Sequence, residues 1–412
     1  MNTESRYSVL FLGHLFPKHL ESVILNQPLP PVQTQRFGEA LLEALAAGFD
    51  GNVEAMSVAS LLDYPKCKLL VAPRAKWYFA DSVHVTMLPF INIIGLKHLT
   101  RFLVTFFFTL VWVIKNRSSK RIIIMHGVQS CKLWGVLLAC IFAPAITIPF
   151  LTDDVGIPLK WEGVWTRKIR KVDVFLIKVA LQHVSGVIAM TPQLASKLAP
   201  GKASLIISAI CNSSMVQTSR VRKQDDDTFS IGYFGMLNQD YGVDLLLSAF
   251  KLADRSKWRL MLAGAGDLQE KIQAVAATDC RVIYLGFLSS NEIVKAYQNV
   301  DVLVNPRRVS VPIASLAFPS KLVEYLWTGK PVITTNLPTL DKDFRDHLIV
   351  MQTDTPEELV RCLDEVASWT AEQLESWREK TLTFVRNELS SFTQGKKIRR
   401  FVDSLSIGHP CA

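Results

Sequence analysis

The stretch FPSKLVEYLWTGKPVITT, residues 318–335, predicts a short helix that ends at a glycine and is followed by a buried strand. Pro319 suits the first turn of a helix, where a missing N–H costs nothing. Gly329 is a natural left-handed terminator. Open α/β sheets bind ligands at the carboxyl ends of their strands. We therefore expect the start of this helix to lie beside a ligand site.

The first turn of this helix has the chemistry of a phosphate site. Free backbone N–H groups at a helix start attract anions, and Lys321 adds a compact positive charge. Glu324 lies three residues later, and hence on nearly the same helix face. A phosphate site with a carboxylate one turn deeper suits a nucleoside diphosphate, whose ribose hydroxyls lie behind its phosphates. The alternative interpretation is an ordinary amphipathic helix with a surface Lys and Glu.

The length and composition of the chain indicate two domains. Of its 412 residues, 49% are apolar, which is enough for two large cores. In both halves short β-branched segments alternate with helical ones, which is typical of parallel, doubly wound sheets. We expect one Rossmann-like domain over residues 1–205 and a second over 206–385. The last stretch, 386–412, is expected to be a helix and tail that pack back on the first domain.

The net charge of +9 is gathered in short basic clusters. One of them, RKIRK at residues 167–171, is interleaved with Trp161, Trp165 and aliphatic residues, a pattern that suits an anionic membrane surface. The alternative is a solvated, slightly basic face. No nucleic-acid reading motif accompanies the charge, so nucleic acid is not an expected partner.

The most apolar run, residues 102–114, is uncharged over 13 residues. A bilayer crossing needs about 20 apolar residues, so we expect a buried or interfacial helix. Seven scattered Cys without a Cys-x-x-Cys pair indicate neither a disulfide framework nor a metal knuckle. No secretion signal is visible at the start. The expected location is the cytoplasm, peripheral on the inner face of the plasma membrane.

Four segments of the second half resemble the GT-B-fold glycosyltransferases of family 4. They are GYFGMLNQDYGVDLLLSAF (232–250), WRLMLAGAGD (258–267), VIYLGFLSSNEIVKAYQNVDVLVNPR (282–307) and FPSKLVEYLWTGKPVITTNLP (318–338). The first half matches in outline, through IIIMHG (122–127), PFLTDDVG (149–156) and GVIAMTPQL (186–194). The resemblance implies an α/β architecture of two Rossmann-like domains facing across a cleft, with a C-terminal helix crossing back.

The resemblance implies a retaining transferase that moves a sugar from a nucleotide-diphosphate donor, UDP- or GDP-linked, to a glycan or lipid-linked acceptor. The NPR and FPSK-x2-EY variants are similar to bacterial enzymes of capsule and exopolysaccharide biosynthesis. No metal or other cofactor is implied, because cations and a helix N-terminus can stabilise the leaving diphosphate. Two alternatives are a nucleotide-sugar epimerase of the same fold and a non-catalytic nucleotide-sugar-binding assembly protein.

The resemblance also implies which residues hold the nucleotide. Glu324 matches the acid that binds the ribose, and the remaining positions match the diphosphate and base contacts. In chain order, the implied nucleotide-binding residues are Gly13, Gly235, Gly286, Phe287, Arg307, Ser320, Lys321 and Glu324. Two positions depart from the family pattern and motivate the non-catalytic alternative. Leu316 stands where an acid is usual, and Tyr241 where a cation is usual.

His126 and Asp153 are the candidate catalytic residues of the first half. His126 follows the strand-like run RIIIM, residues 121–125, and Asp153 follows a second such run. Both are therefore expected at the carboxyl ends of strands. Each has a structural alternative: a hydrogen-bonded core histidine for His126, and a helix cap for the aspartate. His14, in the loop after the first strand, is a further candidate for the acceptor side.

Overall fold

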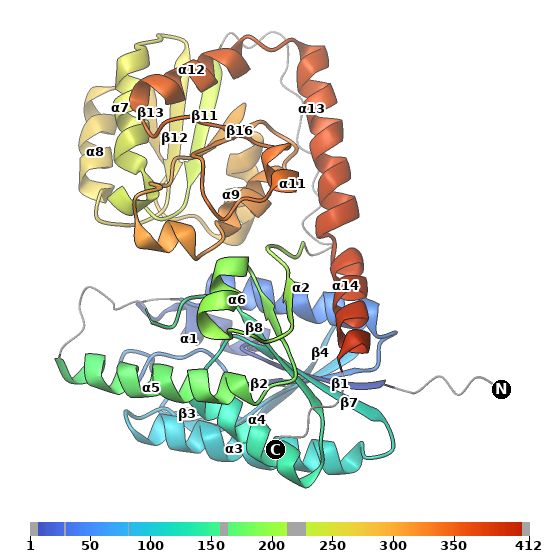
Figure 1. The fold of residues 1–412 in the computed structure, drawn as a ribbon. Coiled ribbons are helices and arrows are strands. Elements are labelled where there is room, and N and C mark those ends of the chain that lie inside the picture. Colours follow the sequence, from blue (N-terminus) through green and yellow to red (C-terminus); the bar gives the residue numbers. More distant parts are fainter. Residues whose placement is uncertain (1–6, 29, 81, 157–163, 212–227, 406–412) are drawn as a thin grey trace. The chain divides into compact units, whose positions relative to one another are not determined.

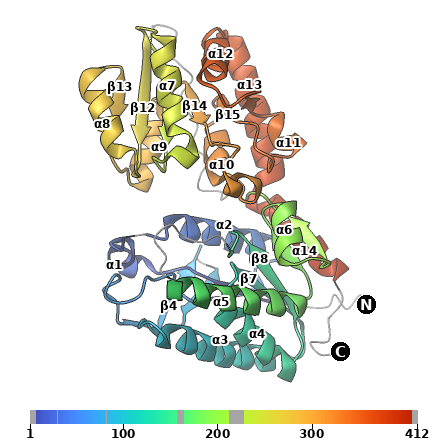
Figure 2. The ribbon, with the colours of Figure 1, turned by 60° about the vertical axis from the view of Figure 1, so that its left-hand side comes forward.

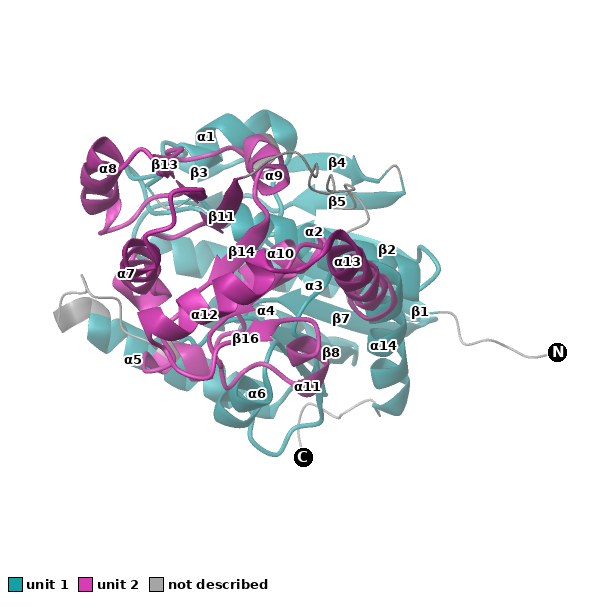
Figure 3. Cartoon of the chain, turned by 90° about the horizontal axis from the view of Figure 1, so that it is seen from above, with its two compact units in different colours: residues 1–212, 390–412 teal, residues 213–389 magenta. Residues whose placement is uncertain are grey.

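The computed structural model describes residues 7–28, 30–80, 82–156, 164–211 and 228–405. The chain divides into two compact units, which Figure 3 colours separately. Unit 1 comprises Met1–Asn212 together with Ser390–Ala412, and unit 2 comprises Ser213–Leu389. Each unit is built on its own sheet and is described by itself.

Unit 1 contains an eight-stranded sheet in the order β10-β9-β8-β7-β1-β2-β5-β4. Neighbouring strands are parallel except at one edge, where β4 runs antiparallel to β5. The strand order reverses at the β1–β7 pair, and the carboxyl ends of these two strands carry Gly13 and His126. The strands are β1 (Tyr7–Gly13), β2 (Val53–Ser57), β4 (Ala75–Phe79), β5 (Val83–Met87), β7 (Lys120–His126), β8 (Ile146–Leu151), β9 (Val187–Ala189) and β10 (Ser204–Ile206), with β3 (Val71–Ala72) and β6 (Phe90–Ile91) as a separate antiparallel pair.

Helices cover both faces of this sheet (Figures 1 and 2). One face carries α3 (Leu96–Lys115), α4 (Ser130–Phe142) and α5 (Val164–Gln182), whose inner side chains share one core with the strands. The other carries α2 (Val32–Gly48) and the C-terminal helix α14 (Ser391–Ser404). Helix α14 thus belongs to unit 1, although it follows unit 2 in the sequence. The shorter helices are η1 (Lys18–Leu20), α1 (Glu21–Leu25) and α6 (Pro192–Leu198).

Two glycines bring α14 against α2. A Cβ on Gly395 would lie 2.1 Å from the carbonyl oxygen of Ala44, and a Cβ on Gly48 would lie 2.4 Å from the carbonyl oxygen of Gly395. No other residue permits so close a backbone approach. Arg399 adds a hydrogen bond, 3.2 Å long, from its Nη1 to the carbonyl oxygen of Gly48. The last described helix is therefore an integral layer of unit 1.

Unit 2 has a parallel six-stranded sheet in the order β13-β12-β11-β14-β15-β16. The order reverses between β11 and β14, the position at which doubly wound sheets bind ligands. The strands are β11 (Phe229–Phe234), β12 (Trp258–Ala263), β13 (Val282–Tyr284), β14 (Val302–Asn305), β15 (Val332–Thr334) and β16 (Ile349–Val350). The helices are η3 (Gln239–Tyr241), α7 (Val243–Ala253), α8 (Gln269–Thr278), α9 (Ser290–Gln298), η4 (Pro312–Ser315), α10 (Ser320–Leu326), α11 (Lys342–Arg345), α12 (Pro356–Ala367), α13 (Ala371–Phe384) and the π-turn η5 (Val385–Leu389).

The apolar run of residues 102–114 lies inside a longer helix than the sequence suggested. Helix α3 has 20 residues because Lys97 and Arg101, which look like a flank in the sequence, are helical. Among the described residues, α3 is the one helix whose length and composition would suffice to cross a membrane, and 33% of its most apolar window is buried. Length and composition alone therefore do not distinguish a core helix from a membrane-associated one, and the contacts of α3 have to be considered.

Candidate active site

The helix predicted from residues 318–335 is present as α10 and begins at Ser320. Pro319 has φ −77° and ψ 93°, so it is the extended N-cap residue, and Ser320 is the first helical residue. The helix is short because Gly329, with φ +69°, reverses the chain soon after it. Strand β15 follows, as expected.

The Lys321 side chain lies across the carboxyl end of β11. Its Nζ donates a hydrogen bond of 3.2 Å to the Tyr233 hydroxyl and lies 4.6 Å from the centre of the Tyr233 ring. Gly235 makes room for it, because a Cβ at that position would lie 1.4 Å from the Lys321 Nζ. The glycine after β11 and the lysine of α10 were both predicted to contact phosphate, and the structure brings them into contact with each other.

Arg307 is the second cation of this cluster. It follows β14 and is buried, and its Nη1 donates a long hydrogen bond of 3.4 Å to the carbonyl oxygen of Ala317. The Tyr241 ring lies beneath both cations, 5.5 Å from the Arg307 guanidinium carbon and 5.4 Å from the Lys321 Nζ. At position 241, where the family pattern has a cation, this chain therefore has a tyrosine. Its ring lies within cation–π range of two other cations, Arg307 and Lys321.

The electrostatics of the cluster favour an anion. Burial lowers the pKa of Lys321 to about 7, although the nearby Glu324 raises it, and the charge of Arg307 lowers it further. Burial also lowers the pKa of Arg307. Within the described part of the chain, no carboxylate forms a salt bridge with either side chain. Two adjacent cations that lack an ion-pair partner are stabilised by a bound anion.

Glu324 lies one turn beyond Lys321, as predicted. Its Oε2 accepts a hydrogen bond of 2.8 Å from the hydroxyl of Tyr297, which holds the carboxylate in place. Glu324 remains partly exposed, whereas Tyr297 is buried. The carboxylate is therefore positioned by the protein and still accessible.

The predicted base-binding residues follow β13. The carbonyl oxygen of Gly286 accepts a hydrogen bond of 2.8 Å from the N–H of Gly264, and a Cβ on Gly264 would lie 1.8 Å from the carbonyl oxygen of Gly235. The backbones of Gly235, Gly264 and Gly286, which follow β11, β12 and β13, are thus in direct contact. Open space surrounds the Cα of Gly286, and the Phe287 side chain is 72% exposed. This edge of the sheet can accommodate a planar group beside the two cations.

His126 of unit 1 is buried at the carboxyl end of β7. Burial, together with the charge of Lys132, lowers the pKa of His126 to about 3, so the imidazole is neutral near pH 7. Its Nδ1 has no hydrogen-bond partner among the described residues. The imidazole is therefore not held by hydrogen bonds on both sides, as a purely structural histidine would be.

Lys132 joins His126 to His14, and sequence analysis missed it. The Lys132 Nζ donates to the carbonyl oxygen of His126 at 2.5 Å and lies 3.0 Å from the Nε2 of His14. The Nδ1 of His14 lies 2.7 Å from the carbonyl oxygen of Val58. Because the Nδ1–H donates to that carbonyl, the Nε2 accepts from the lysine, which fixes the tautomer of His14. The sequence signal was a single cation in the apolar helix SCKLWGVLLACIF, α4.

The remaining predicted residues of unit 1 have different surroundings. Asp153 is exposed, and no hydrogen bond or ion pair joins it to the described residues. Its neighbour Asp154 accepts a hydrogen bond of 3.0 Å from the N–H of Gly156 and pairs with Lys197 at 2.8 Å. The turn-capping role thus falls to Asp154. Gly13 ends β1, and a Cβ there would lie 2.4 Å from the Phe11 ring, so packing alone requires this glycine.

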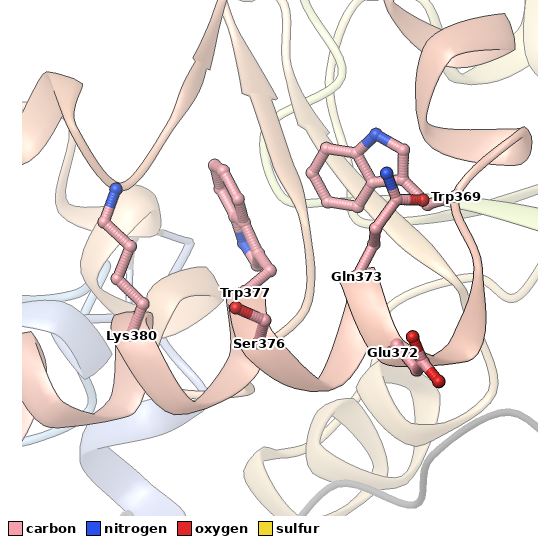
Figure 4. Close-up of a pocket in the computed structure, with 6 residues that line it drawn as sticks. All are labelled: Trp369, Glu372, Gln373, Ser376, Trp377 and Lys380. Carbon is pink, nitrogen blue, oxygen red and sulfur yellow. The ribbon is translucent and has the colours of Figure 1, made fainter.

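No group of three or more His, Cys, Asp and Glu side chains could hold a metal ion within the described ranges. Metal independence stays a prediction from the family resemblance. A hollow of about 420 Å³ lies along α13, well away in the chain from α10 (Figure 4). It is lined by Trp369, Glu372, Gln373, Ser376, Trp377 and Lys380. The two indoles, 5.1 Å apart, pack on the core of unit 2.

Comparison with known proteins gives a family match within the second unit. Residues 228–368 match the family described as glycosyl transferases group 1. The matched segment lies within unit 2. Over 116 residues the chain is 28% identical to an uncharacterized glycosyltransferase of Methanocaldococcus jannaschii, covering 27% of this chain and 28% of that protein. It is 26% identical over 174 residues to a 41.2 kDa protein in the cps region of Klebsiella pneumoniae, covering 41% and 42%. The matches thus span less than half of these relatives.

Solved structures show the same fold over nearly the whole chain. The UDP complex of Anabaena HepE has a TM-score of 0.61 at 16% identity and covers 97% of this chain and 100% of HepE. A sucrose-phosphate synthase from Thermosynechococcus elongatus has a TM-score of 0.63 at 13% identity and covers 96% and 98%. A Rickettsia africae glycosyltransferase has a TM-score of 0.64 at 13% identity, also covering 96% and 98%. The GT-B fold expected from the sequence is confirmed.

Proposed function

We propose that this chain is a retaining glycosyltransferase that moves a sugar from a nucleotide-diphosphate donor to a lipid-linked glycan in surface-polysaccharide biosynthesis. The observation that carries the proposal is the pair of cations, Lys321 and Arg307, at the β11–β14 reversal of a glycosyltransferase domain. They lie where a doubly wound sheet binds its ligand, and they lack a carboxylate ion pair among the described residues. Glu324, one turn deeper, suits the ribose hydroxyls.

The chemistry follows from the leaving group. When the bond between the anomeric carbon and the diphosphate oxygen breaks, that oxygen keeps the electron pair, and negative charge develops on the phosphates. Fixed cations stabilise this charge more strongly than water does, because they are already oriented. A bound diphosphate raises the pKa of Lys321, so the lysine is charged when it is needed. Retention of configuration is carried over from the family resemblance.

The finer choices rest on the relatives. HepE has been solved in complex with UDP and with UDP-glucose, which supports a uridine donor over a guanosine one. The Klebsiella relative lies in a cps region, which supports a role in capsule-type polysaccharide. Such acceptors are carried on lipids, and the exposed Arg167, Lys168 and Lys171 of α5 favour work at the cytoplasmic membrane face. Trp161 of the predicted aromatic-basic segment lies outside the described residues.

Titration calorimetry of the full chain with UDP, GDP and UDP-glucose tests the nucleotide site. We expect UDP to bind, Lys321→Gln to weaken binding, and Lys271→Gln, a change at an exposed lysine on α8, to leave it unchanged. Binding that is equal in all three proteins would contradict the proposed site. Incubation of the preferred donor with and without membrane extract then separates the functions. Nucleotide release that needs the extract supports transfer, isomerisation without it indicates an epimerase, and binding without turnover indicates an assembly protein.

A further inference from the structure

Helix α3 of unit 1 buries four polar side chains next to its core residues Trp112 and Val113, and exposes an apolar stripe. The residues at every fourth position, Lys97, Arg101, Thr105 and Thr109, are buried. The opposite stripe is apolar and 39–67% exposed, and it consists of Leu96, Leu99, Leu103, Phe107, Val111 and Ile114. A surface helix of a soluble protein has the reverse arrangement, with its apolar stripe on the core.

The buried charges fix α3 in this orientation. The Lys97 Nζ donates to the carbonyl oxygen of Leu61 at 2.6 Å and pairs with Asp63 at 2.8 Å. The Arg101 Nη2 donates to the carbonyl oxygen of Ala59 at 2.7 Å, and the guanidinium carbon lies 4.3 Å from the centre of the Phe90 ring. Rotating or withdrawing α3 would break these hydrogen bonds and the ion pair, and would leave the carbonyl oxygens of Leu61 and Ala59 without their donors, which is unfavourable. The helix is therefore bound lengthwise to unit 1 and presents its apolar stripe outward.

The neighbouring helix extends the apolar surface. Helix α4 packs closely along α3, because Gly135 allows approach to 3.0 Å between its Cβ position and the Cβ of Thr105. At the end of α4, Ile141 and Phe142 are exposed, and the Phe142 ring lies 6.3 Å from that of Phe106 on α3. We call the stripe of α3 together with Ile141 and Phe142 the α3 face. Soluble monomers rarely expose so continuous an apolar surface.

The segment that forms the α3 face contains cations but no carboxylates of its own. The sequence has no Asp or Glu between Asp81 and Asp153, a segment that contains all of α3 and α4. Lys115, the last residue of α3, and Arg117 just after it are exposed cations, and Lys115 lies 3.8 Å from the exposed carboxylate of Glu54 on β2. Lys171 is exposed on α5, which covers the same side of the sheet (Figure 2). An exposed apolar stripe in a segment that carries cations and no carboxylates of its own complements the interface of an anionic bilayer. A second copy of the chain would instead bring like charges together.

We propose that the α3 face inserts into the interface of an anionic membrane, with α3 lying in the membrane plane and unit 1 on the cytoplasmic side. This deepens the proposed function, on which it rests for the identity of the acceptor, since it names the surface that would bring unit 1 to lipid-linked glycan. The apolar stripe supplies burial among acyl chains, and the bordering cations supply attraction to anionic headgroups. The surface is distinct from the basic segment predicted from the sequence, which lies on α5.

Vesicle co-sedimentation of the full chain tests the proposal. The probes are vesicles of phosphatidylcholine alone and of phosphatidylcholine mixed with phosphatidylglycerol. The wild type should bind the mixed vesicles, and Phe107→Ser with Val111→Ser should weaken partitioning by about tenfold or more. The matched control is Leu252→Ser with Phe392→Ser on α7 and α14. Its side chains, 53% and 55% exposed, resemble the 56% and 67% of the α3 pair. This control should bind like the wild type.

Two further measurements keep the outcomes distinct. Thermal unfolding and UDP calorimetry of both variants should match the wild type, so a loss of vesicle binding cannot be attributed to misfolding or to a failed nucleotide site. Equal sedimentation of the α3 variant and the wild type would overturn the proposal, as would a wild type that binds UDP but no anionic vesicle. Sedimentation velocity without lipid tests the alternative that a second copy of the chain covers the α3 face. A dimer that the α3 variant dissociates would reassign the face to a second copy of the chain.

Discussion

The two sheets each place a lysine at the point where their strand order reverses, and in both cases burial lowers its pKa to about 7. The surroundings differ. Lys132 in unit 1 is fully buried, and its ammonium group donates hydrogen bonds to the carbonyl oxygen of His126 and the Nε2 of His14. Lys321 in unit 2 is partly exposed and meets only a neutral hydroxyl and two aromatic rings at comparable range. The same residue type is thus a positioning group in one unit and a ready anion-binding group in the other.

The largest expected effect is on stability, from Lys132→Met. The change leaves the carbonyl oxygen of His126 and the Nε2 of His14 buried without a donor, and we expect the free energy of unfolding to fall by about 2–4 kcal/mol. Denaturant unfolding measures it. Lys202→Met is the control, because the Lys202 Nζ also donates to a carbonyl oxygen, that of Val184 at 3.1 Å, but in a less buried place. A loss for Lys132→Met no larger than that of the control would remove the contrast between the two lysines.

Lys321→Met should have the converse outcome. We expect the affinity for UDP to fall by about 1.5–3 kcal/mol, the range for hydrogen bonds to charged groups. Stability should hold or rise, because a poorly solvated ammonium is removed. Calorimetry with UDP measures the affinity, and denaturant unfolding measures the free energy of unfolding. Were the variant destabilised while its affinity stayed the same, Lys321 would have to be regarded as structural, like Lys132.

Glu324→Gln should have a smaller effect, of about 1–2 kcal/mol on UDP affinity, because an amide still donates to and accepts from hydroxyls. Testing UDP and 2′-deoxy-UDP on both proteins forms a double-mutant cycle. If Glu324 binds the ribose, the deoxy nucleotide loses affinity for the wild type and much less for the variant. Parallel losses in the two proteins would exclude the 2′-hydroxyl as its partner.

The smallest expected effect is on the number of protons that the protein takes up when it binds UDP. The folded-state pKa of Lys321, about 7, lies below that of an unfolded lysine, so the unfolded chain binds more protons and the free energy of unfolding rises with pH from about 7 to 10. A bound diphosphate raises this pKa, so at pH 8 UDP binding should take up a fraction of one proton. Calorimetry in buffers of different ionisation enthalpy measures this uptake. It should vanish in Lys321→Met and persist in Lys132→Met if the latter folds.

The sequence predicted unit 2 better than unit 1, for a physical reason. Strands β11 and β12 lie where they were expected, because short buried strands followed by glycine are a local pattern. Lys321 was expected at a helix start beside a ligand site, and the family resemblance added Gly235 and Arg307 to the same nucleotide site. Local pattern and position in the sheet agree there.

Unit 1 hides its distinctive features in contacts between distant residues. The role of Lys132 depends on acceptors from His14 and His126, which no local pattern links to it. The orientation of α3 depends on a loop near Asp63, so the sequence gives its apolar content but not the side that faces outward. The uncharged run 102–114 likewise does not show that the helix begins at Leu96, because the buried partners of Lys97 and Arg101 lie far away in the sequence.

The glycine contact between α14 and α2 has a consequence for biosynthesis. Residues at the two extremes of the chain complete a single layer, with Gly395 against the backbone of Ala44 and Gly48. During synthesis, the first part of unit 1 leaves the ribosome before α14 does. Unit 1 therefore lacks this helix while all of unit 2 is synthesised and free to fold. Chaperones that hold incomplete nascent chains would therefore meet unit 1 for longer than unit 2, because the surface of α2 that α14 covers stays exposed until α14 has been synthesised.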